Sequence, residues 1–212
     1  MVLITCPILS SWGLGKMTVK LRVIQLAQLE IAALGGISFL LLDAFFFQLV
    51  QGELPCAFCN LIRVCFMLLG SGLILNRIYG INPWNYVLSG IGALIGIMLS
   101  LLFMFAKALP TTKPTGSAIL GLHMYTWTFM IFTAALFFCL VMAALYAQRE
   151  SHDSPGHALD ARPRWHKGII ALFVALIFSN LVSAFLQNGF DHFMAGGQQH
   201  YRILYDGDVM KP

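Results

Sequence analysis

Residues 35–50 read GGISFLLLDAFFFQLV, a run in which only Ser38, Asp43 and Gln48 are polar. Extended back to residue 28, the stretch has the roughly 20 mostly apolar residues that an α-helix needs to cross a bilayer core of about 30 Å. Four further stretches of the chain qualify in the same way, at 59–75, 86–106, 120–146 and 168–186. We therefore expect an all-α membrane protein with five spans.

The composition of the chain supports the same class. The residue types Ala, Val, Ile, Leu, Met, Phe, Trp, Tyr and Cys make up 58% of the sequence, and only 10% of the residues are charged, whereas soluble domains carry about 25% charged residues. So few charges cannot cover the surface of a soluble globule. A soluble domain, a disordered chain, a nucleic-acid-binding domain and a disulfide-stapled miniprotein are therefore excluded.

The distribution of lysine and arginine predicts the orientation of the spans. With a cytoplasmic N-terminus, eight of these residues fall on the cytoplasmic side and four on the other, which is the bias that the positive-inside rule describes. The eight are Lys16, Lys20, Arg22, Arg77, Arg149, Arg162, Arg164 and Lys167, and the four are Lys107, Lys113, Arg202 and Lys211. We expect the N-terminus in the cytoplasm of a bacterium and the C-terminus in the oxidising periplasm, with the protein in the inner membrane.

These expectations divide the chain into three parts. Residues 1–23 form a cytoplasmic N-terminal segment, in which Met17 is an alternative start to Met1. Residues 24–187 form the transmembrane domain, with a polar cytoplasmic loop at 148–167, and residues 188–212 form a periplasmic tail. The first sixteen residues are not expected to act as a signal peptide, because no basic segment precedes their apolar part.

The segment that carries candidate chemistry is residues 51–63, QGELPCAFCNLIR, at the expected periplasmic mouth of the second span. Cys56 and Cys59 have the spacing of a pair that closes a small disulfide. The free N–H groups and the dipole of a helix N-terminus stabilise a thiolate, which is the species that thiol–disulfide exchange requires. Arg63 lies one turn deeper on the same helix face as Cys59. An ionised residue inside a span is a functional candidate by default.

Each of these features has an alternative interpretation. A Cys-x-x-Cys motif is also half of a zinc site, but Cys6, Cys65 and Cys139 supply no second pair to complete it, so we expect no metal there. The pair is alternatively inert. Arg63 alternatively extends to the lipid headgroups or pairs with Asp43. We expect Cys65 and Cys139 to be ordinary buried residues.

The pattern Pro-Cys-x-x-Cys-x-x-x-Arg between the first two of several membrane helices resembles the DsbB family of quinone-linked disulfide bond formation proteins. Residues 121–127 (GLHMYTW), 180–189 (NLVSAFLQNG) and 201–204 (YRIL) are similar to a five-span branch of that family. The resemblance implies a DsbB-like four-helix transmembrane bundle, here with an additional C-terminal span. It also implies a ubiquinone or menaquinone beside the cysteine pair, held in part by Arg63. Electrons would pass from a periplasmic thioredoxin-like dithiol protein of DsbA type, through Cys56 and Cys59, to the quinone.

One part of the family pattern is missing from this chain. The resemblance implies a second periplasmic cysteine pair, which in this branch would lie near residues 188–193 and exchange with the partner protein. Residues 187–212, QNGFDHFMAGGQQHYRILYDGDVMKP, contain no cysteine, and the loop at 109–119 contains none either. Either the partner exchanges directly with Cys56 and Cys59, or turnover is lost and only quinone or partner binding is kept.

His123 is the second candidate for quinone binding, because it is expected at the same end of the bundle as the cysteine pair. Its imidazole would hydrogen-bond a quinone carbonyl or move its proton, and the alternative is an ordinary histidine of the membrane interface. The neighbouring Tyr125 and Trp127 fit the aromatic belt of such an interface.

The sequence therefore predicts a membrane thiol–quinone oxidoreductase that supports periplasmic disulfide bond formation, with Cys56 and Cys59 as its catalytic residues. The main alternative is a non-catalytic DsbB-like subunit or assembly factor. In one variant of that alternative the tail binds copper through Asp191, His192, Met194 and His200. A transporter is disfavoured, because the spans hold few charges and the sequence shows no internal repeat.

Overall fold

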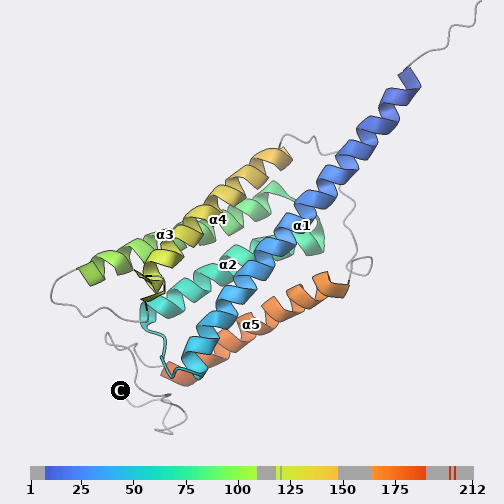
Figure 1. Ribbon diagram of the computed structural model, residues 1–212. Coiled ribbons are helices and arrows are strands. Elements are labelled where there is room, and N and C mark those ends of the chain that lie inside the picture. The colour runs from blue at the N-terminus through green and yellow to red at the C-terminus, as the bar shows by residue number, and fades with distance from the viewer. Residues whose placement is uncertain are drawn as a thin grey trace, which may run out of the picture.

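In the part of the chain that it describes, the computed structural model consists almost wholly of helices (Figure 1). It describes residues 8–108, 118–119, 121–147, 164–189, 201 and 203, with side chains from residue 27 onward apart from 108, 118–119 and 147. The helices are α1 (Ile8–Leu49), α2 (Ala57–Tyr79), α3 (Pro83–Ala108), α4 (Met124–Ala147) and α5 (Arg164–Asn188). Two short antiparallel strands, β1 (Ala118–Ile119) and β2 (Leu122–His123), precede α4.

In the described part of the chain, five helical segments are long and apolar enough to cross a membrane. They are Ala27–Leu49, Ala57–Tyr79, Pro83–Lys107, Met124–Tyr146 and Arg164–Asn188. The expectation of an all-α membrane protein with five spans is confirmed.

The bounds of the spans differ from those expected, by one residue at each end of the first and by up to four residues in the others. The second span was expected at 59–75 but continues to Tyr79, and the fifth was expected at 168–186 but runs from Arg164 to Asn188. The sequence-based bounds stopped at polar side chains such as Arg77 and Gln187, which are in fact buried inside the bundle. The fourth was expected from residue 120, but helix α4 begins at Met124, because residues 122–123 belong to a strand.

Helix α2 lies at the centre of the bundle (Figure 1). It packs against α3, which in turn packs against α4, and on its other side it meets α1 and α5, which also pack against each other. Successive helices alternate in direction, so the C-terminal ends of α1, α3 and α5 and the N-terminal ends of α2 and α4 lie at one end of the bundle. We call this end the cysteine end, because Cys56 and Cys59 lie there, and the opposite end the Glu30 end.

The helix ends follow from local chemistry. Helix α3 has proline at its first position, where a missing N–H costs nothing, and the side-chain oxygen of Asn82 accepts the backbone N–H of Trp84 at 3.1 Å, as an N-cap residue does. Helix α5 ends at Asn188, and the next residue, Gly189, has a φ of 63°, in the left-handed region that favours glycine. Its N–H donates to the carbonyl of Phe185 at 2.7 Å.

The contact between α2 and α3 depends on glycine. A Cβ placed on Gly92 would lie 2.8 Å from the backbone nitrogen of Leu69, so the two helix backbones approach as closely as small residues allow. One turn further along α3, Gly96 faces the ring of Phe132 in α4, which stacks on Phe66 of α2 with ring centroids 4.2 Å apart. Helices α2, α3 and α4 therefore form one tightly packed unit.

Candidate active site at the cysteine end

The cysteine pair lies at the N-terminus of α2. Pro55 ends the loop from α1, and Cys56 is the N-cap residue of the helix, with the extended backbone angles φ −70° and ψ 170°. Its sulfur accepts the backbone N–H of Cys59 at 3.3 Å, and the two sulfurs lie 2.7 Å apart. The expected placement of the pair at a helix N-terminus is thus what the structure has, with the two sulfurs in direct contact.

These contacts lower the pKa of Cys56 to about 6, well below the ordinary value of a thiol. The largest cause is the hydrogen bond from the Cys59 side chain, and backbone N–H groups at the start of the helix add to it, whereas burial opposes it. Cys56 is half-buried, and Cys59 is the more deeply buried of the two. Cys56 is therefore the cysteine that carries a thiolate near neutral pH in the dithiol state.

Helix α5 reaches the cysteine motif through Gln187, whose side chain is fully buried. Its side-chain nitrogen donates to the carbonyl oxygen of Pro55 at 2.7 Å, and its side-chain oxygen accepts the amide of Asn60 at 3.3 Å. The last span is therefore in direct contact with both flanks of the Cys56–Cys59 segment.

Arg63 is buried one turn below Cys59, with 8% of its surface exposed. Its guanidinium donates to the side-chain oxygen of Gln48 at 2.6 Å, to the carbonyl of Ala44 at 2.9 Å and to the side-chain oxygen of Asn180 at 3.5 Å. It also lies 5.5 Å from the centre of the Phe45 ring. Neither alternative raised from the sequence fits these contacts: the Arg63 side chain is buried inside the bundle, and its hydrogen-bond partners among the described residues are Gln48, Ala44 and Asn180 and not Asp43.

Gln48 connects Arg63 to the other elements of this end. While its oxygen accepts from Arg63, its nitrogen donates to the hydroxyl of Ser183 in α5 at 2.7 Å and to the hydroxyl of Tyr201. Residues of α1, α2, α5 and the C-terminal segment thus share one hydrogen-bonded cluster. The sequence indicated Arg63 but missed Gln48, Asn180 and Gln187, since a lone amide in an apolar helix has no recognisable spacing.

His123 lies on a different side of the motif. Its ring stacks on Tyr125 with centroids 5.2 Å apart, Tyr125 meets Phe103 edge-on at 5.4 Å, and Phe103 stacks on Phe58, inside the Cys-x-x-Cys motif, at 5.4 Å. The row of four rings thus links His123 to the cysteine segment. The Nδ1 atom of His123 is buried and has no hydrogen-bond partner among the described residues. The structure therefore brings both Arg63 and His123 to the cysteine end of the bundle. Arg63 packs against α1 and α5, whereas His123 packs against the row of aromatic rings.

An open apolar groove runs along the bundle between α1, α2 and α4, with a volume of about 440 Å³. It is deeper in the membrane-spanning part than the cysteine pair, since Leu69 and Leu73 in its wall are six and ten residues beyond Arg63 along α2. The wall is almost wholly apolar; further members are Ala33, Gly36, Leu40, Ile131 and Ala135.

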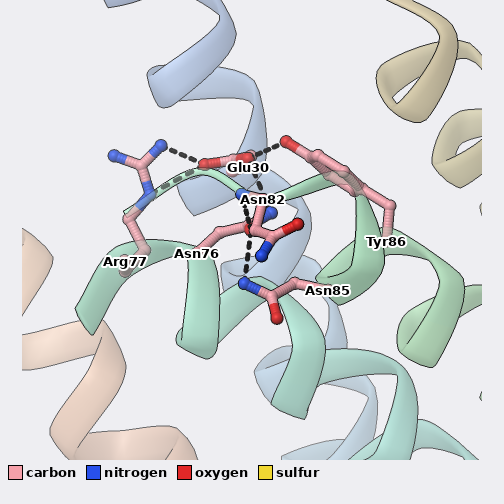
Figure 2. Close-up of polar contacts among 6 residues, drawn as sticks. All are labelled: Glu30, Asn76, Arg77, Asn82, Asn85 and Tyr86. Carbon is pink, nitrogen blue, oxygen red and sulfur yellow. Dashed lines mark hydrogen bonds and ion pairs between the residues drawn. The ribbon is translucent and has the colours of Figure 1, made fainter. Parts of the chain in front are cut away.

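A second buried polar cluster lies at the Glu30 end (Figure 2). Glu30 of α1 has no exposed surface, and its carboxylate accepts from Arg77 and Asn76 of α2 and from the hydroxyl of Tyr86 in α3. The Nε of Arg77 lies 2.8 Å from one carboxylate oxygen. Asn76 in turn accepts from Asn85 and from the backbone of Asn82. The carboxylate is saturated with donors, so this cluster joins α1, α2 and α3 and leaves no acceptor for a ligand.

The remaining cysteines and the tail residues are the other candidates from the sequence. Cys65 and Cys139 are 4% and 2% exposed and belong to the core, as expected of ordinary buried residues. The tail residues considered for copper, Asp191, His192, Met194 and His200, lie outside the described residues. Within the described ranges, no group of three or more His, Cys, Asp or Glu residues is arranged to hold a metal ion.

The fold and the site define a multi-pass membrane protein with a Cys-x-x-Cys pair capping a membrane helix. Comparison with known families identifies it further, since residues 27–117 match the family described as disulfide bond formation protein DsbB. The matched stretch holds the membrane part of α1, the cysteine pair, Arg63 and α3, and it confirms the resemblance seen in the motif. The match ends before α4 and α5. No curated protein and no solved structure matches the chain.

The match to this family indicates a role in disulfide bond formation and, in general terms, a disulfide oxidoreductase. Proteins of the family are generally linked to quinones and to DsbA-type thioredoxin-like partners.

Proposed function

We propose that the protein is a membrane thiol–quinone oxidoreductase in which Cys56 and Cys59 pass two electrons from a thioredoxin-like dithiol protein to a quinone. The observation that carries the proposal is the contact between the two sulfurs at the N-cap of α2, where the Cys56 thiolate is stabilised by Cys59 and by backbone N–H groups. Such a pair has the two properties that thiol–disulfide exchange needs, a thiolate and a neighbouring sulfur.

The exchange step uses the oxidised pair. A thiolate of the partner attacks the sulfur of Cys56, which is the less buried of the two. A mixed disulfide forms, the Cys56–Cys59 bond breaks, and its electron pair goes to Cys59, one helical turn above the positive charge of Arg63. The second partner thiol loses its proton and attacks the partner's own sulfur, and Cys56 leaves as a thiolate. The partner ends oxidised, and Cys56 and Cys59 end reduced.

The residues at this end fit a quinone as the next acceptor. The apolar groove between α1, α2 and α4 suits an isoprenoid tail, and the unpartnered Nδ1 of His123 is a buried polar atom available to a carbonyl oxygen. When bound, a quinone would take two electrons and two protons from the dithiol and regenerate the Cys56–Cys59 disulfide. We propose that Arg63 supplies positive charge at this site and that His123 supplies a hydrogen bond.

The proposal assigns the partner's exchange to Cys56 directly, because the tail contains no cysteine. The pair lies at the N-terminal end of the span Ala57–Tyr79, with Cys56 just before it and Cys59 in its first turn, which supports access by a soluble partner. The alternative of a non-catalytic DsbB-like subunit or assembly factor rests on the same missing cysteines, and it predicts that the redox state of Cys56 and Cys59 has no effect on partner oxidation.

The test is quinone-dependent oxidation of a reduced thioredoxin-like protein by the purified full-length chain. We expect Cys56→Ser and Cys59→Ser each to abolish it. Cys139→Ser is the matched control, because Cys139 is buried in the core of α4, and it should retain activity. Full activity of Cys56→Ser would exclude the exchange mechanism and favour the non-catalytic alternative.

The same proposal requires the cysteine end to face the periplasm, as the lysine and arginine bias of the loops favours. A reporter active only in the periplasm should give signal when fused after Lys211 and none when inserted at 151–162. The reverse pattern would place the cysteine pair in the reducing cytoplasm, where a disulfide-forming role is untenable.

A further inference from the structure

Helix α5 carries a buried polar face in an otherwise apolar span. Asn180, Ser183 and Gln187 are three and four residues apart, which places them on one side of the helix. Asn180 and Gln187 are 5% and 0% exposed. Polar side chains inside a span are costly unless partners satisfy them. Asn180 and Ser183 accept from Arg63 and Gln48, and Gln187 contacts the residues that flank the cysteine pair, so this face is directed at the redox pair.

Gln187 is the member of this face that touches the motif itself. Its two hydrogen bonds, to the carbonyl of Pro55 and from the amide of Asn60, end on the residue before Cys56 and the residue after Cys59. One fully buried side chain therefore holds both ends of the four-residue segment that contains the two sulfurs.

The conformation of Cys56 depends on what holds the peptide before it. As an N-cap residue it has extended backbone angles, and in this conformation its sulfur accepts the N–H of Cys59. Rotation of the Pro55–Cys56 peptide would turn the sulfur away from that N–H. The bond from Gln187 to the Pro55 carbonyl opposes this rotation, and the bond to Asn60 fixes the first turn of α2 against the same side chain.

We infer that Gln187 is a positioning residue of the redox pair, which holds Cys56 in the N-cap conformation where its sulfur meets Cys59 and so sets the reactivity of Cys56. The inference rests on the proposed function in one respect, that the Cys56–Cys59 pair is the reactive centre. Helix α5 thus contributes to the redox site and is not merely an additional membrane span.

The contacts of Arg63 point to the same role for α5. Asn180 accepts from Arg63 directly, and Ser183 accepts from Gln48, whose oxygen accepts from Arg63. The last span therefore constrains the charged residue below the pair as well as the segment that carries it.

The test is the pH dependence of Cys56 alkylation in the purified, reduced full-length protein, followed for the Cys56 peptide by mass spectrometry. In Gln187→Leu, which keeps the size but neither hydrogen bond, we expect the midpoint to move to higher pH. The rate below neutral pH should fall by about fivefold, the effect of losing the one neutral hydrogen bond to the Pro55 carbonyl that opposes rotation of the Pro55–Cys56 peptide. Ser179→Ala, at an exposed position of the same helix, is the matched control and should leave the profile unchanged.

A second variant, Asn60→Ala, removes only the bond from α2 to Gln187, and we expect a smaller shift in the same direction. If Gln187→Leu does not fold, Asn60→Ala still tests whether Gln187 positions Cys56. Wild-type alkylation profiles in the folded variants would overturn the inference, even with a lowered unfolding temperature, since that combination is what a purely structural role predicts. The measurement uses neither quinone nor partner, so it is independent of the activity test: a shifted profile in a protein without quinone-dependent oxidation would refute the proposed function alone.

Discussion

Neutralising Glu30 is expected to destabilise the bundle strongly, because the carboxylate is fully buried and is the counter-charge of Arg77. The substitution Glu30→Gln keeps the shape of the side chain but leaves the Arg77 guanidinium without a negative partner in the interior. Removing one member of a buried ion pair typically costs about 3–5 kcal/mol. Since the new amide oxygen still accepts one bond from Tyr86 or Asn76, we expect a loss near the lower limit, about 3 kcal/mol in the free energy of unfolding.

The assay is reversible unfolding of the purified protein in mixed micelles, followed by helix content. Asp43→Asn is the matched control, because Asp43 is an acidic residue of the same helix that is only partly buried, and it should change stability little. In the double variant Glu30→Gln, Arg77→Met, the buried unpaired charge is gone, so much of the lost stability should return. Wild-type stability of Glu30→Gln, or strictly additive losses in the double variant, would refute the assignment of a buried ion pair.

Three further predictions concern the site and its support. Cys56 should be alkylated with a midpoint near pH 6, because its lowered pKa lets thiolate accumulate as the pH rises through that value. Cys59→Ala should move the midpoint up towards the ordinary thiol value of about 8.5. A midpoint already at the ordinary value in the wild-type protein would contradict the geometry. Arg63→Met should raise the apparent quinone KM by roughly tenfold, about 1.4 kcal/mol of a charge-assisted contact, with Arg63→Lys intermediate, and an unchanged KM would remove Arg63 from the quinone site. Gly92→Ala should cost about 1–3 kcal/mol, because its Cβ would lie 2.8 Å from the backbone nitrogen of Leu69, whereas Gly36→Ala, with open space around it, should be neutral in the same unfolding assay.

The number of spans and the place of the cysteine pair were readable from the sequence for simple reasons. Span length is a property of the bilayer, so an apolar run of sufficient length predicts a helix whatever it packs against. The Pro-Cys-x-x-Cys spacing likewise carries local information, since a proline followed by a capping residue marks a helix start. These features depend only on neighbours in the chain.

The partners of the buried polar groups were not readable, because they come from distant parts of the chain. Glu30 and Arg77 are 47 residues apart, and Gln187 and Pro55 are 132 apart. From the sequence, Arg77 was counted among the cations of the cytoplasmic loops, and Gln187 was taken as the polar residue at which the fifth span ends. The packing of α1 against α2 places Arg77 in a buried ion pair, and the packing of α5 against α2 brings Gln187 into contact with the cysteine motif.

The choice between Asp43 and Gln48 as the partner of Arg63 shows the same limit. An acidic residue in a neighbouring span is the natural guess for a buried arginine, but the structure supplies neutral oxygens from Gln48, Asn180 and Ala44 instead. The guanidinium thus keeps a net positive charge beside Cys59, which a carboxylate partner would have cancelled.

The redox state of Cys56 and Cys59 in intact membranes tests the central claim most directly. Thiol trapping with a mass-tagged alkylating reagent should find the pair as a disulfide when respiratory quinone is present and as a dithiol when quinone synthesis is blocked, with Cys65 and Cys139 reduced in both conditions. A pair that remains in one state whatever the quinone supply would contradict the account.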